Sequence, residues 1–348
     1  MDVHPTHPMA SRTMDRRTFL RRTMIGGAAL GFAGVGLERL VRRNQLPRPW
    51  DASAFAPPGT ARVAVVRASS YDGDLEGQVR DGLGLIGADV RGARVLLKPN
   101  FVEYDPWTAI NTDPRLVAAV ALAVRRMGAA SVTVGEGPGH RRDTQYVITR
   151  SGLVDALGAV DTPFVDLNAD LVVPVRLRSA YTPLRALWLP RAVVDADVVI
   201  SMPKMKTHHW AGVTLSLKNC FGCVPGRVYG WPKNALRWAG LEQAIIDVAA
   251  AVRPRYAIVD GIVGMQGNGP ISGTPVQSNV LVFGDDPVAT DVVSARLMGF
   301  DPEKVGYIAE AGRFLGQADP SRIETEGESV DAAISDFAVL PQFESLKA

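Results

Sequence analysis

The sequence predicts an α/β protein with a mostly parallel sheet flanked by helices and an irregular, loop-rich insertion. Two observations favour this class. Short apolar, β-branched runs alternate with longer segments of helical periodicity, and no internal repeat or low-complexity tract interrupts the alternation. The 348 residues, of which 47% are hydrophobic, are enough to bury a sizeable core. We therefore expect a sheet covered by helices on both faces.

The expected elements lie between residues 62 and 315. Strands are expected at 62–67, 94–98, 131–134, 197–201, 256–260 and 280–284. Helices are expected at 75–86, 114–127, 235–252, 288–298 and 302–315. The stretch 203–234 is rich in Gly, Pro, Trp and Lys and has no clear periodicity. We expect a long loop there, and loops of that length in compact domains are usually functional.

Residues 1–45 resemble a signal for the twin-arginine export pathway. The heptapeptide DRRTFLR at 15–21 matches a consensus in which a polar residue precedes Arg-Arg-x-Phe-Leu. The uncharged apolar stretch 24–36 follows it and is too short to cross a hydrocarbon core about 30 Å thick, as is typical of a signal h-region. We expect the twin-arginine translocase to export the folded protein to the periplasm, with Met1 or Met14 as the true start.

The fate of this leader has two alternatives. Ala54 and Ala56 both end small-x-small sequences that a signal peptidase cuts, although Pro57 disfavours the second site. An uncleaved leader would instead tether the protein to the membrane. Residues 46–60 are expected to form a linker, 61–325 the α/β domain and 326–348 a C-terminal extension.

The net charge of +2 conceals an asymmetry along the chain. Residues 1–45 carry eight arginines and three acidic residues, whereas the remainder has 30 basic and 33 acidic residues. The body therefore lacks the basic excess with which proteins bind nucleic acid non-specifically. We expect no nucleic-acid partner.

Polar side chains follow five of the predicted strands, at the point where each strand ends. These loops are 98–100 (KPN), 136–140 (EGPGH), 202–209 (MPKMKTHH), 261–270 (GIVGMQGNGP) and 285–287 (DDP). In open α/β sheets, ligands bind in the crevice outside the carboxyl ends of the strands. We expect the five loops to build one site there.

Lysines are the first candidates in this crevice, because arginine carries most of the positive charge elsewhere. Lys98, Lys204, Lys206 and Lys218 lie in or near the loops. A lysine can hold a carboxylate or phosphate as a point charge, or act as a nucleophile or base once its pKa is lowered. We favour anion binding and expect a small anionic ligand.

The remaining candidates are amides and proton-transfer groups. Asn100, Asn219 and Asn268 are expected to orient the substrate, which Lys98, Lys204 and Lys218 bind. The expected catalytic residues are His208, Lys206 and Glu136, as proton donors or acceptors. His208 and His209 are adjacent, so on a strand they would point to opposite faces and only one would serve the site.

The cofactor is unknown from sequence, and the cysteines leave three alternatives open. Asp260, Asp286 and Asp291 could supply oxygen ligands to a divalent metal. Cys220 and Cys223 form a C-x-x-C pair that is read as two core thiols, as a disulfide or redox couple, or as part of a metal site. An iron–sulfur cluster is disfavoured because it would need two further thiolates.

Several segments together resemble the bacterial and archaeal family Domain of Unknown Function 362, over roughly residues 60–325. They are KPN at 98–100, DADVVISMPKMKTH at 195–208, GVTLSLKN at 212–219, FGCVPG at 221–226, DGIVGMQGNGP at 260–270 and DPVATD at 286–291. Some relatives carry ferredoxin-like cysteine motifs, which this chain lacks. Relatives often have a histidine where this chain reads Arg237, and an arginine cannot act as a base near neutral pH.

Two functions follow from these residues. The first is an exported enzyme that acts on a small anionic substrate in the crevice. The alternative is a non-catalytic binding or accessory protein of the cell envelope, linked to the maturation of a redox enzyme. We favour the enzyme, because a binding module needs no residue that can exchange protons near neutral pH.

Overall fold

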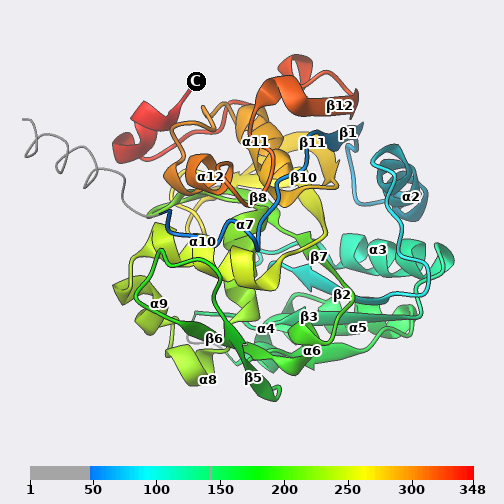
Figure 1. The fold of residues 1–348 in the computed structure, drawn as a ribbon. Helices are drawn as coiled ribbons and strands as arrows, with labels where there is room; N and C mark the ends of the chain where they lie inside the picture. The colour runs from blue at the N-terminus through cyan, green and yellow to red at the C-terminus, as the bar shows by residue number, and fades with distance from the viewer. Residues whose placement is uncertain (1–47, 141–142) are drawn as a thin grey trace, which may run out of the picture. The chain divides into compact units, whose positions relative to one another are not determined.

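A mixed, mostly parallel sheet runs through the body of the protein (Figure 1). The computed structural model describes residues 48–140 and 143–348, and residues 49–348 form one compact unit. The expected signal, its apolar stretch and the tether lie outside the described residues. The strand order is β12-β1-β11-β10-β7-β2-β3-β4, with β8 paired to β10 and β9 paired to β8.

The strands of this sheet are mostly short and buried. They are β1 Ala61–Arg67, β2 Arg94–Pro99, β3 Ser131–Glu136, β4 Phe164–Asp166, β7 Val198–Met202, β8 Lys204–His208, β9 Gly212–Thr214, β10 Tyr256–Gln266, β11 Thr274–Gly284 and β12 Ile323–Gly327. A separate antiparallel hairpin joins β5 Val172–Arg176 to β6 Ala186–Pro190. The predicted α/β class is confirmed, and all six expected strands are present; four have small shifts at their ends, whereas β10 and β11 are each six residues longer than expected.

One long strand reverses the direction of the chain within the sheet. β11 is antiparallel to both β1 and β10, and its last residue, Gly284, lies opposite Val63 and Ala257, near the start of those strands. The carboxyl end of β11 therefore lies at the opposite edge of the sheet from the carboxyl ends of its parallel neighbours. Asp286, which follows β11, cannot join a site built from those neighbours.

Helices cover both faces of the sheet (Figure 1). They are α2 Leu75–Leu85, α3 Pro114–Arg126, α4 Thr144–Arg150, α5 Leu153–Ala159, α6 Arg191–Val194, α7 Ser216–Asn219, α8 Gly226–Tyr229, α9 Asn234–Trp238, α10 Leu241–Val252, α11 Pro287–Leu297 and α12 Gly306–Ala311, with 3-10 turns η1 Cys220–Cys223, η2 Pro320–Arg322, η3 Asp331–Ala333 and η4 Pro341–Leu346. Helices α2 to α5 pack on one face, and α7 and α10 to α12 pack on the other.

Successive strand residues feed two separate cores, because side chains alternate between the faces of a sheet. Ala64 and Ile258 lie in the core beneath α2 to α5. Val63, Val65 and Val259 lie in the core beneath the other helices. Apolar side chains therefore cover both faces of the sheet, and polar functional side chains are expected where the strands end.

Two expectations about local structure were wrong. The expected helix 235–252 is two helices, because Gly240 adopts φ 107 between α9 and α10, a conformation that glycine tolerates and other residues do not. The expected loop 203–234 contains β8, β9, α7, η1 and α8. All five residues of β8 (KMKTH) are buried, so its lysines conceal the strand in a hydropathy pattern.

Residues at both ends of the expected domain pack on its body. Trp50 stacks on Phe314 with ring centroids 4.8 Å apart, and Phe55 meets the same ring edge-on at 4.8 Å. The two expected cleavage sites fall in this packed stretch. At the other end, β12 pairs with β1, and Phe337 is fully buried.

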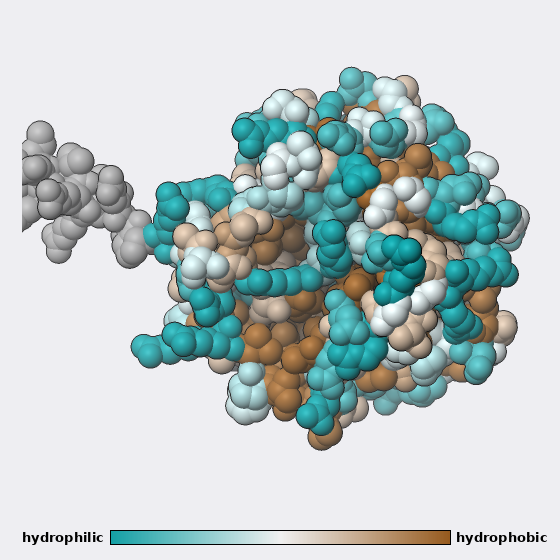
Figure 2. All heavy atoms as spheres, turned by 45° about the vertical axis from the view of Figure 1, so that its right-hand side comes forward, coloured by the Kyte–Doolittle hydropathy of each residue, from teal (hydrophilic) through white to brown (hydrophobic). Residues whose placement is uncertain are grey.

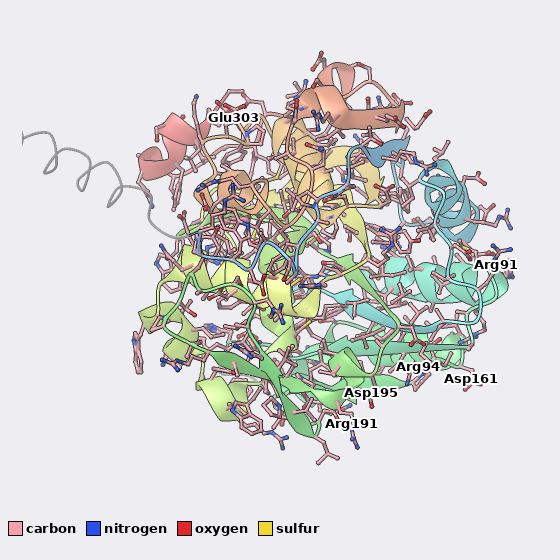
Figure 3. All side chains as sticks on the ribbon, in the orientation of Figure 1. Arg91, Arg94, Asp161, Arg191, Asp195 and Glu303 are labelled. Carbon is pink, nitrogen blue, oxygen red and sulfur yellow. The ribbon has the colours of Figure 1, made fainter. Side chains whose placement is uncertain are left out.

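Exposed charged side chains on the surface form ion pairs with one another. On the face drawn in Figure 2, hydrophilic residues are widespread and hydrophobic atoms show between them. Arg94 pairs with Asp197 at 2.9 Å and Arg191 with Asp195 at 3.6 Å, on the outside of the molecule (Figure 3). Such exposed pairs stabilise a fold by about 0–1 kcal/mol each. In the part of the chain that the structure describes, no helix has both the length and the apolar character needed to cross a membrane.

Candidate functional site

A cleft of about 590 Å³ lies beside the carboxyl ends of β2, β3 and β8. Parallel strands bring these ends to one edge of the sheet, which is where the sequence predicts a site. The cleft is lined by Asn100, Phe101, Val102, Glu136, Gly137, Gly139, His140, Lys206, His208, His209, Trp210, Thr214, Lys218, Asn219, Phe221, Gly222, Pro232, Lys233, Asn234, Arg237, Leu241, Pro270 and Ile271.

A buried ion pair forms one wall of the cleft. The Nζ of Lys98, at the end of β2, donates to Oε2 of Glu136, at the end of β3, over 2.8 Å, and both side chains are 1% exposed. The backbone N–H of Phe101 donates to the same oxygen over 2.8 Å, and that of Gly137 donates to Oε1 over 2.7 Å. These donors hold the carboxylate in one orientation.

Two asparagines connect this pair to helix α7. Nδ2 of Asn100 donates to Oδ1 of Asn219 over 3.1 Å, and Nδ2 of Asn219 donates to the Lys98 carbonyl over 2.9 Å. Oδ1 of Asn100 and Oγ1 of Thr214 are buried and have no hydrogen-bond partner among the described residues. Both side chains line the cleft, and a buried polar atom without a partner costs about 1–3 kcal/mol. The two atoms are therefore candidates for contact with a ligand.

Positive charge accumulates around the pair. Nζ of Lys206 donates to the Ile110 carbonyl over 2.7 Å. Nζ of Lys233 donates to two carbonyls, those of Gly137 (2.7 Å) and Phe221 (2.6 Å). Lys218 and Arg237 also line the cleft, and among its described lining residues Glu136 is the one carboxylate. The cleft therefore holds more cations than its own anion can balance.

The pKa values of these cations fall because a charged form is disfavoured there. Burial lowers the pKa of Lys233 to about 7, although Glu136 acts in the opposite direction. Burial, followed by repulsion from Arg237 and Lys98, lowers the pKa of Lys218 to about 8. Burial, followed by repulsion from Lys218, also holds the pKa of Lys206 well below its ordinary value. A bound anion would reverse part of each shift.

Both histidines of the HH pair line the cleft, contrary to the expectation that only one would. His208 is the last residue of β8, and the chain turns away at His209, whose N–H donates to the Gly269 carbonyl over 2.8 Å. Nδ1 of His208 accepts from the N–H groups of Trp210 (3.1 Å) and Ala211 (3.3 Å). The proton of the neutral ring is therefore on Nε2. Burial, followed by repulsion from Lys218, lowers the pKa of His208 well below its ordinary value, so the ring is neutral.

Three expected ligand-binding residues, Lys98, Lys204 and Asn268, do not line the cleft, and Lys98 lies behind Glu136 as its ion-pair partner. Nζ of Lys204 donates to Oδ2 of Asp260 over 2.7 Å and to the Tyr71 hydroxyl over 2.9 Å, and it is buried by this partnership. Asn268 is exposed beyond the end of β10. β10 continues to Gln266, so most of the glycine-rich segment expected as a loop is strand, and only residues 270 and 271 reach the cleft.

The three aspartates considered as metal ligands have separate protein partners. Asp260 bonds to Lys204, and Asp286 caps α11 by accepting from the N–H groups of Val288 and Ala289. Asp291 accepts from the N–H groups that begin α7, and burial raises its pKa to about 8. Across residues 48–140 and 143–348, no group of three or more His, Cys, Asp or Glu is placed to hold a metal ion.

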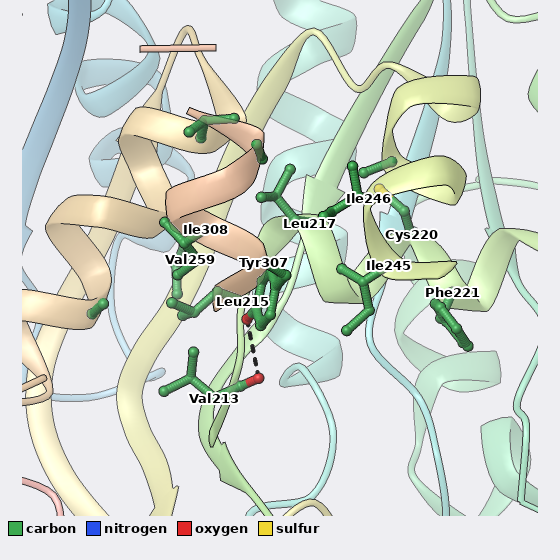
Figure 4. Close-up of a cluster of buried hydrophobic side chains, with 14 of the residues drawn as sticks. Val213, Leu215, Leu217, Cys220, Phe221, Ile245, Ile246, Val259, Tyr307 and Ile308 are labelled. Carbon is green, nitrogen blue, oxygen red and sulfur yellow. Dashed lines mark hydrogen bonds between the residues drawn. The ribbon is translucent and has the colours of Figure 1, made fainter. Parts of the chain in front are cut away.

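The cysteines belong to the hydrophobic core. Cys220 and Cys223 are buried and not bonded to each other, and Cys220 lies close to Ile246 and Leu217 in Figure 4. Burial raises the pKa of both thiols, that of Cys223 to about 11. This environment keeps the thiols protonated and is typical of packing residues.

Sequence reasoning missed three prominent lining residues. They are Lys233, Trp210 and Arg237, whose guanidinium carbon lies 3.8 Å from the centroid of the Trp210 ring. Lys233 could have been found by the criterion applied to the other lysines, because it lies in the same lysine-containing stretch 203–234. Arg237 was noted only as the replacement for a histidine.

Comparisons with known proteins agree on a family. The family described as "Domain of unknown function (DUF362)" matches residues 95–296. The "Thylakoid-associated protein sll1697" of Synechocystis sp. is 33% identical over 262 residues, which are 72% of this chain and 78% of that protein.

Similarity to solved structures is more limited. The lactate racemase apoprotein from Thermoanaerobacterium thermosaccharolyticum superposes with a TM-score of 0.45 and 14% identity over 70% of this chain and 57% of that one. A structural-genomics target from Thermotoga maritima gives a TM-score of 0.32 and 13% identity, over 58% of this chain and 54% of that one.

Proposed function

The chain belongs to the family described as Domain of unknown function (DUF362), and from this premise we propose that it is an enzyme that binds a small organic anion in the cleft. One observation carries the proposal. The cleft is lined by Lys206, Lys218, Lys233 and Arg237, whereas its one described carboxylate, Glu136, is already paired with Lys98. An anion would balance this charge, and lysine and arginine side chains are its usual partners.

The size and walls of the cleft favour an organic anion over an inorganic one. A volume of about 590 Å³ falls within the roughly 300–1,000 Å³ of sites for small organic molecules. Apolar side chains, chiefly Phe101, Trp210, Leu241 and Ile271, form a further part of the lining. The anionic group would lie against the lysines and the organic part against this apolar wall.

The same cleft offers groups for proton transfer. His208 is neutral, with its Nε2–H as the remaining donor, so we assign it a hydrogen bond to an oxygen of the bound anion or to an oxygen that gains negative charge during the reaction. Lys206 has a lowered pKa, which allows it to hold the anion or to exchange a proton. Glu136 accepts three hydrogen bonds and orients Lys98.

A thermal-shift experiment with the described domain tests the proposal. Phenyl phosphate is the probe, and we expect it to raise the melting temperature of the wild-type protein. Lys206→Met should lose most of this rise, because it removes a cation from the cleft. Lys304→Met is the matched control, since the Lys304 side chain is 47% exposed and pairs with Asp301 outside the cleft. An equal rise in all three proteins would refute the proposal.

We also propose that the protein acts outside the cytoplasm, where an uncleaved leader would hold it at the membrane. The twin-arginine sequence at 15–21 supports export through the translocase, and a relative is named thylakoid-associated. The same observations favour the second candidate, an accessory protein of the cell envelope. Replacing Arg16 and Arg17 by lysine should leave the protein in the cytoplasmic fraction. An unchanged distribution after cell fractionation would contradict export by this pathway.

A further inference from the structure

The lysines around the cleft differ in what their amino groups contact. Lys98, Lys206 and Lys233 each donate to at least one carbonyl or carboxylate oxygen over 2.6–2.8 Å. Lys218 has no hydrogen bond or ion pair to any residue that the structure describes. Its Nζ lies 4.8 Å from the centroid of the Phe221 ring. An ammonium group without an acceptor lacks the hydrogen bonds that would stabilise its charged form, so it loses a proton more readily.

The position of Lys218 keeps this amino group within reach of a ligand. The residue belongs to α7, which is fixed because Asp291 accepts from the N–H groups of Ser216 (2.6 Å) and Leu217 (2.9 Å). The side chain is partly exposed and lines the cleft. The amide of the next residue, Asn219, is held in the hydrogen-bond network of Lys98. The helix therefore presents Lys218 to the cleft from a rigid support.

The charges that face Lys218 are positive or neutral. Arg237 is on α9, Lys98 on β2, and Lys206 and neutral His208 on β8, and His209 and Lys233 also interact with it electrostatically. Burial, followed by repulsion from Arg237 and Lys98, lowers its pKa to about 8. About a tenth of the side chain is then unprotonated at pH 7, several hundred times more than for an ordinary lysine. Desolvation beside another cation is a known way to make a lysine nucleophilic.

We propose that Lys218 is a nucleophile that forms a Schiff base with a carbonyl group on the bound anion. This inference rests on the proposed function and specifies its substrate class as a carbonyl compound that carries a carboxylate or a phosphate. The other lysines and Arg237 hold the anionic group. The amino group of Lys218 does not contact the anionic group and instead attacks the carbonyl carbon.

The reaction needs no oxidant or reductant. The Nζ lone pair of neutral Lys218 forms a bond to the carbonyl carbon, and the C=O π pair moves to oxygen, which takes up a proton. The nitrogen loses a proton, and the carbinolamine then expels its hydroxyl group as water when a donor protonates it. The proton that the nitrogen has released is the one that the hydroxyl takes up, through solvent, and the Nε2–H of neutral His208 can donate a hydrogen bond to the departing oxygen. One amine and one carbonyl give one C=N bond and one water.

Trapping with borohydride tests the assignment directly. Pyridoxal 5′-phosphate is the probe because it combines an aldehyde with a phosphate, and sodium borohydride fixes any Schiff base that it forms. With a limiting amount of probe near neutral pH, peptide mapping should find the label on Lys218. Inorganic phosphate should protect this residue by competing for the cations. Labelling should increase as the pH rises through about 8.

Two variants separate nucleophilicity from binding. Lys218→Arg keeps a positive charge without a nucleophilic amine and should lose the label, whereas Lys304→Arg, at an exposed site, should keep it on Lys218. Label on other lysines with Lys218 unmodified would overturn the assignment. Calorimetry with inorganic phosphate distinguishes the two levels of failure. Phosphate binding without Lys218 labelling refutes only the Schiff base, and absence of phosphate binding refutes the anion site as well.

Discussion

Two buried lysine–carboxylate pairs lie near the same edge of the sheet and do different work. Lys98 pairs with Glu136 at 2.8 Å, and Lys204 pairs with Asp260 at 2.7 Å. Each lysine lies on a strand, and each side chain is at most 2% exposed. Glu136 lines the cleft, whereas the second pair is closed off by Tyr71, whose hydroxyl donates to Asp260 over 2.6 Å.

The difference lies in the charge that surrounds each pair. Around Lys204 one ammonium meets one carboxylate, and the Asp260 oxygens also accept from the Tyr71 hydroxyl and the Asp113 N–H (2.9 Å). That pair is complete without a ligand. Around Lys98 the one described carboxylate is that of Glu136, and the cleft beside it is also lined by four cationic side chains, those of Lys206, Lys218, Lys233 and Arg237. A buried lysine therefore indicates an anion-binding site only where the neighbouring side chains leave positive charge without a partner.

The largest expected effect is on the closed pair. Lys204→Met leaves Asp260 buried and unpaired, and we expect the free energy of unfolding to fall by about 3–5 kcal/mol. Urea denaturation of the described domain measures it. The double variant Lys204→Met/Asp260→Leu removes both charges and should recover most of the loss. Wild-type stability in the single variant would mean that the Lys204–Asp260 pair does not stabilise the fold.

A pH titration should change the affinity of the cleft for an anion. Lys233 and Lys218, with pKa values of about 7 and 8, add positive charge to the cleft only while they are protonated, and phenyl phosphate has no carbonyl group with which neutral Lys218 could react. The affinity for phenyl phosphate should therefore fall as the pH rises from 7 to 9, by up to about tenfold per pH unit for each proton linked to binding. Calorimetry in two buffers of different ionisation enthalpy should show proton uptake on binding. An affinity independent of pH would contradict the part assigned to these two lysines.

Sequence predicted the edge of the sheet that carries the site but not all of its members. Lys98 and Glu136 follow neighbouring parallel strands, so their meeting could be foreseen. Asp286 was wrongly grouped with them, because the run VLVFG reads alike in a parallel strand and in antiparallel β11. Direction within a sheet depends on long-range pairing, which a local pattern does not encode.

The division of labour between the lysines could not be foreseen either. Lys204 and Lys206 are two residues apart on β8 and share one sequence context. Their roles are set by what lies opposite: Asp260 on β10 for the first, and the Ile110 carbonyl and the cleft for the second. These partners are distant in the chain, so only the folded structure separates a framework lysine from a cleft lysine.

The hydroxyl that closes the Lys204 pair gives a smaller effect. Tyr71→Phe removes a donor to Asp260 and an acceptor for Lys204 without changing the shape of the side chain. We expect a loss of about 1–3 kcal/mol in the free energy of unfolding, since two buried groups each lose one of several partners. The affinity for phenyl phosphate should stay at the wild-type value. A large loss of affinity would show that the closed pair and the cleft are coupled, and the contrast between them would have to be abandoned.

The smallest expected effect concerns the apolar wall, and it separates the organic part of the ligand from its charge. Trp210 stacks on Arg237 and is 51% exposed at the cleft, so Trp210→Ala should leave the fold intact. The variant should bind inorganic phosphate as the wild type does and phenyl phosphate more weakly, by about 0.5–1.5 kcal/mol, the range of an aromatic contact. Parallel titrations with both probes give this difference directly. An equal loss for both would mean that Trp210 acts by positioning Arg237. The apolar wall would then select no organic group, and the cleft would recognise charge alone.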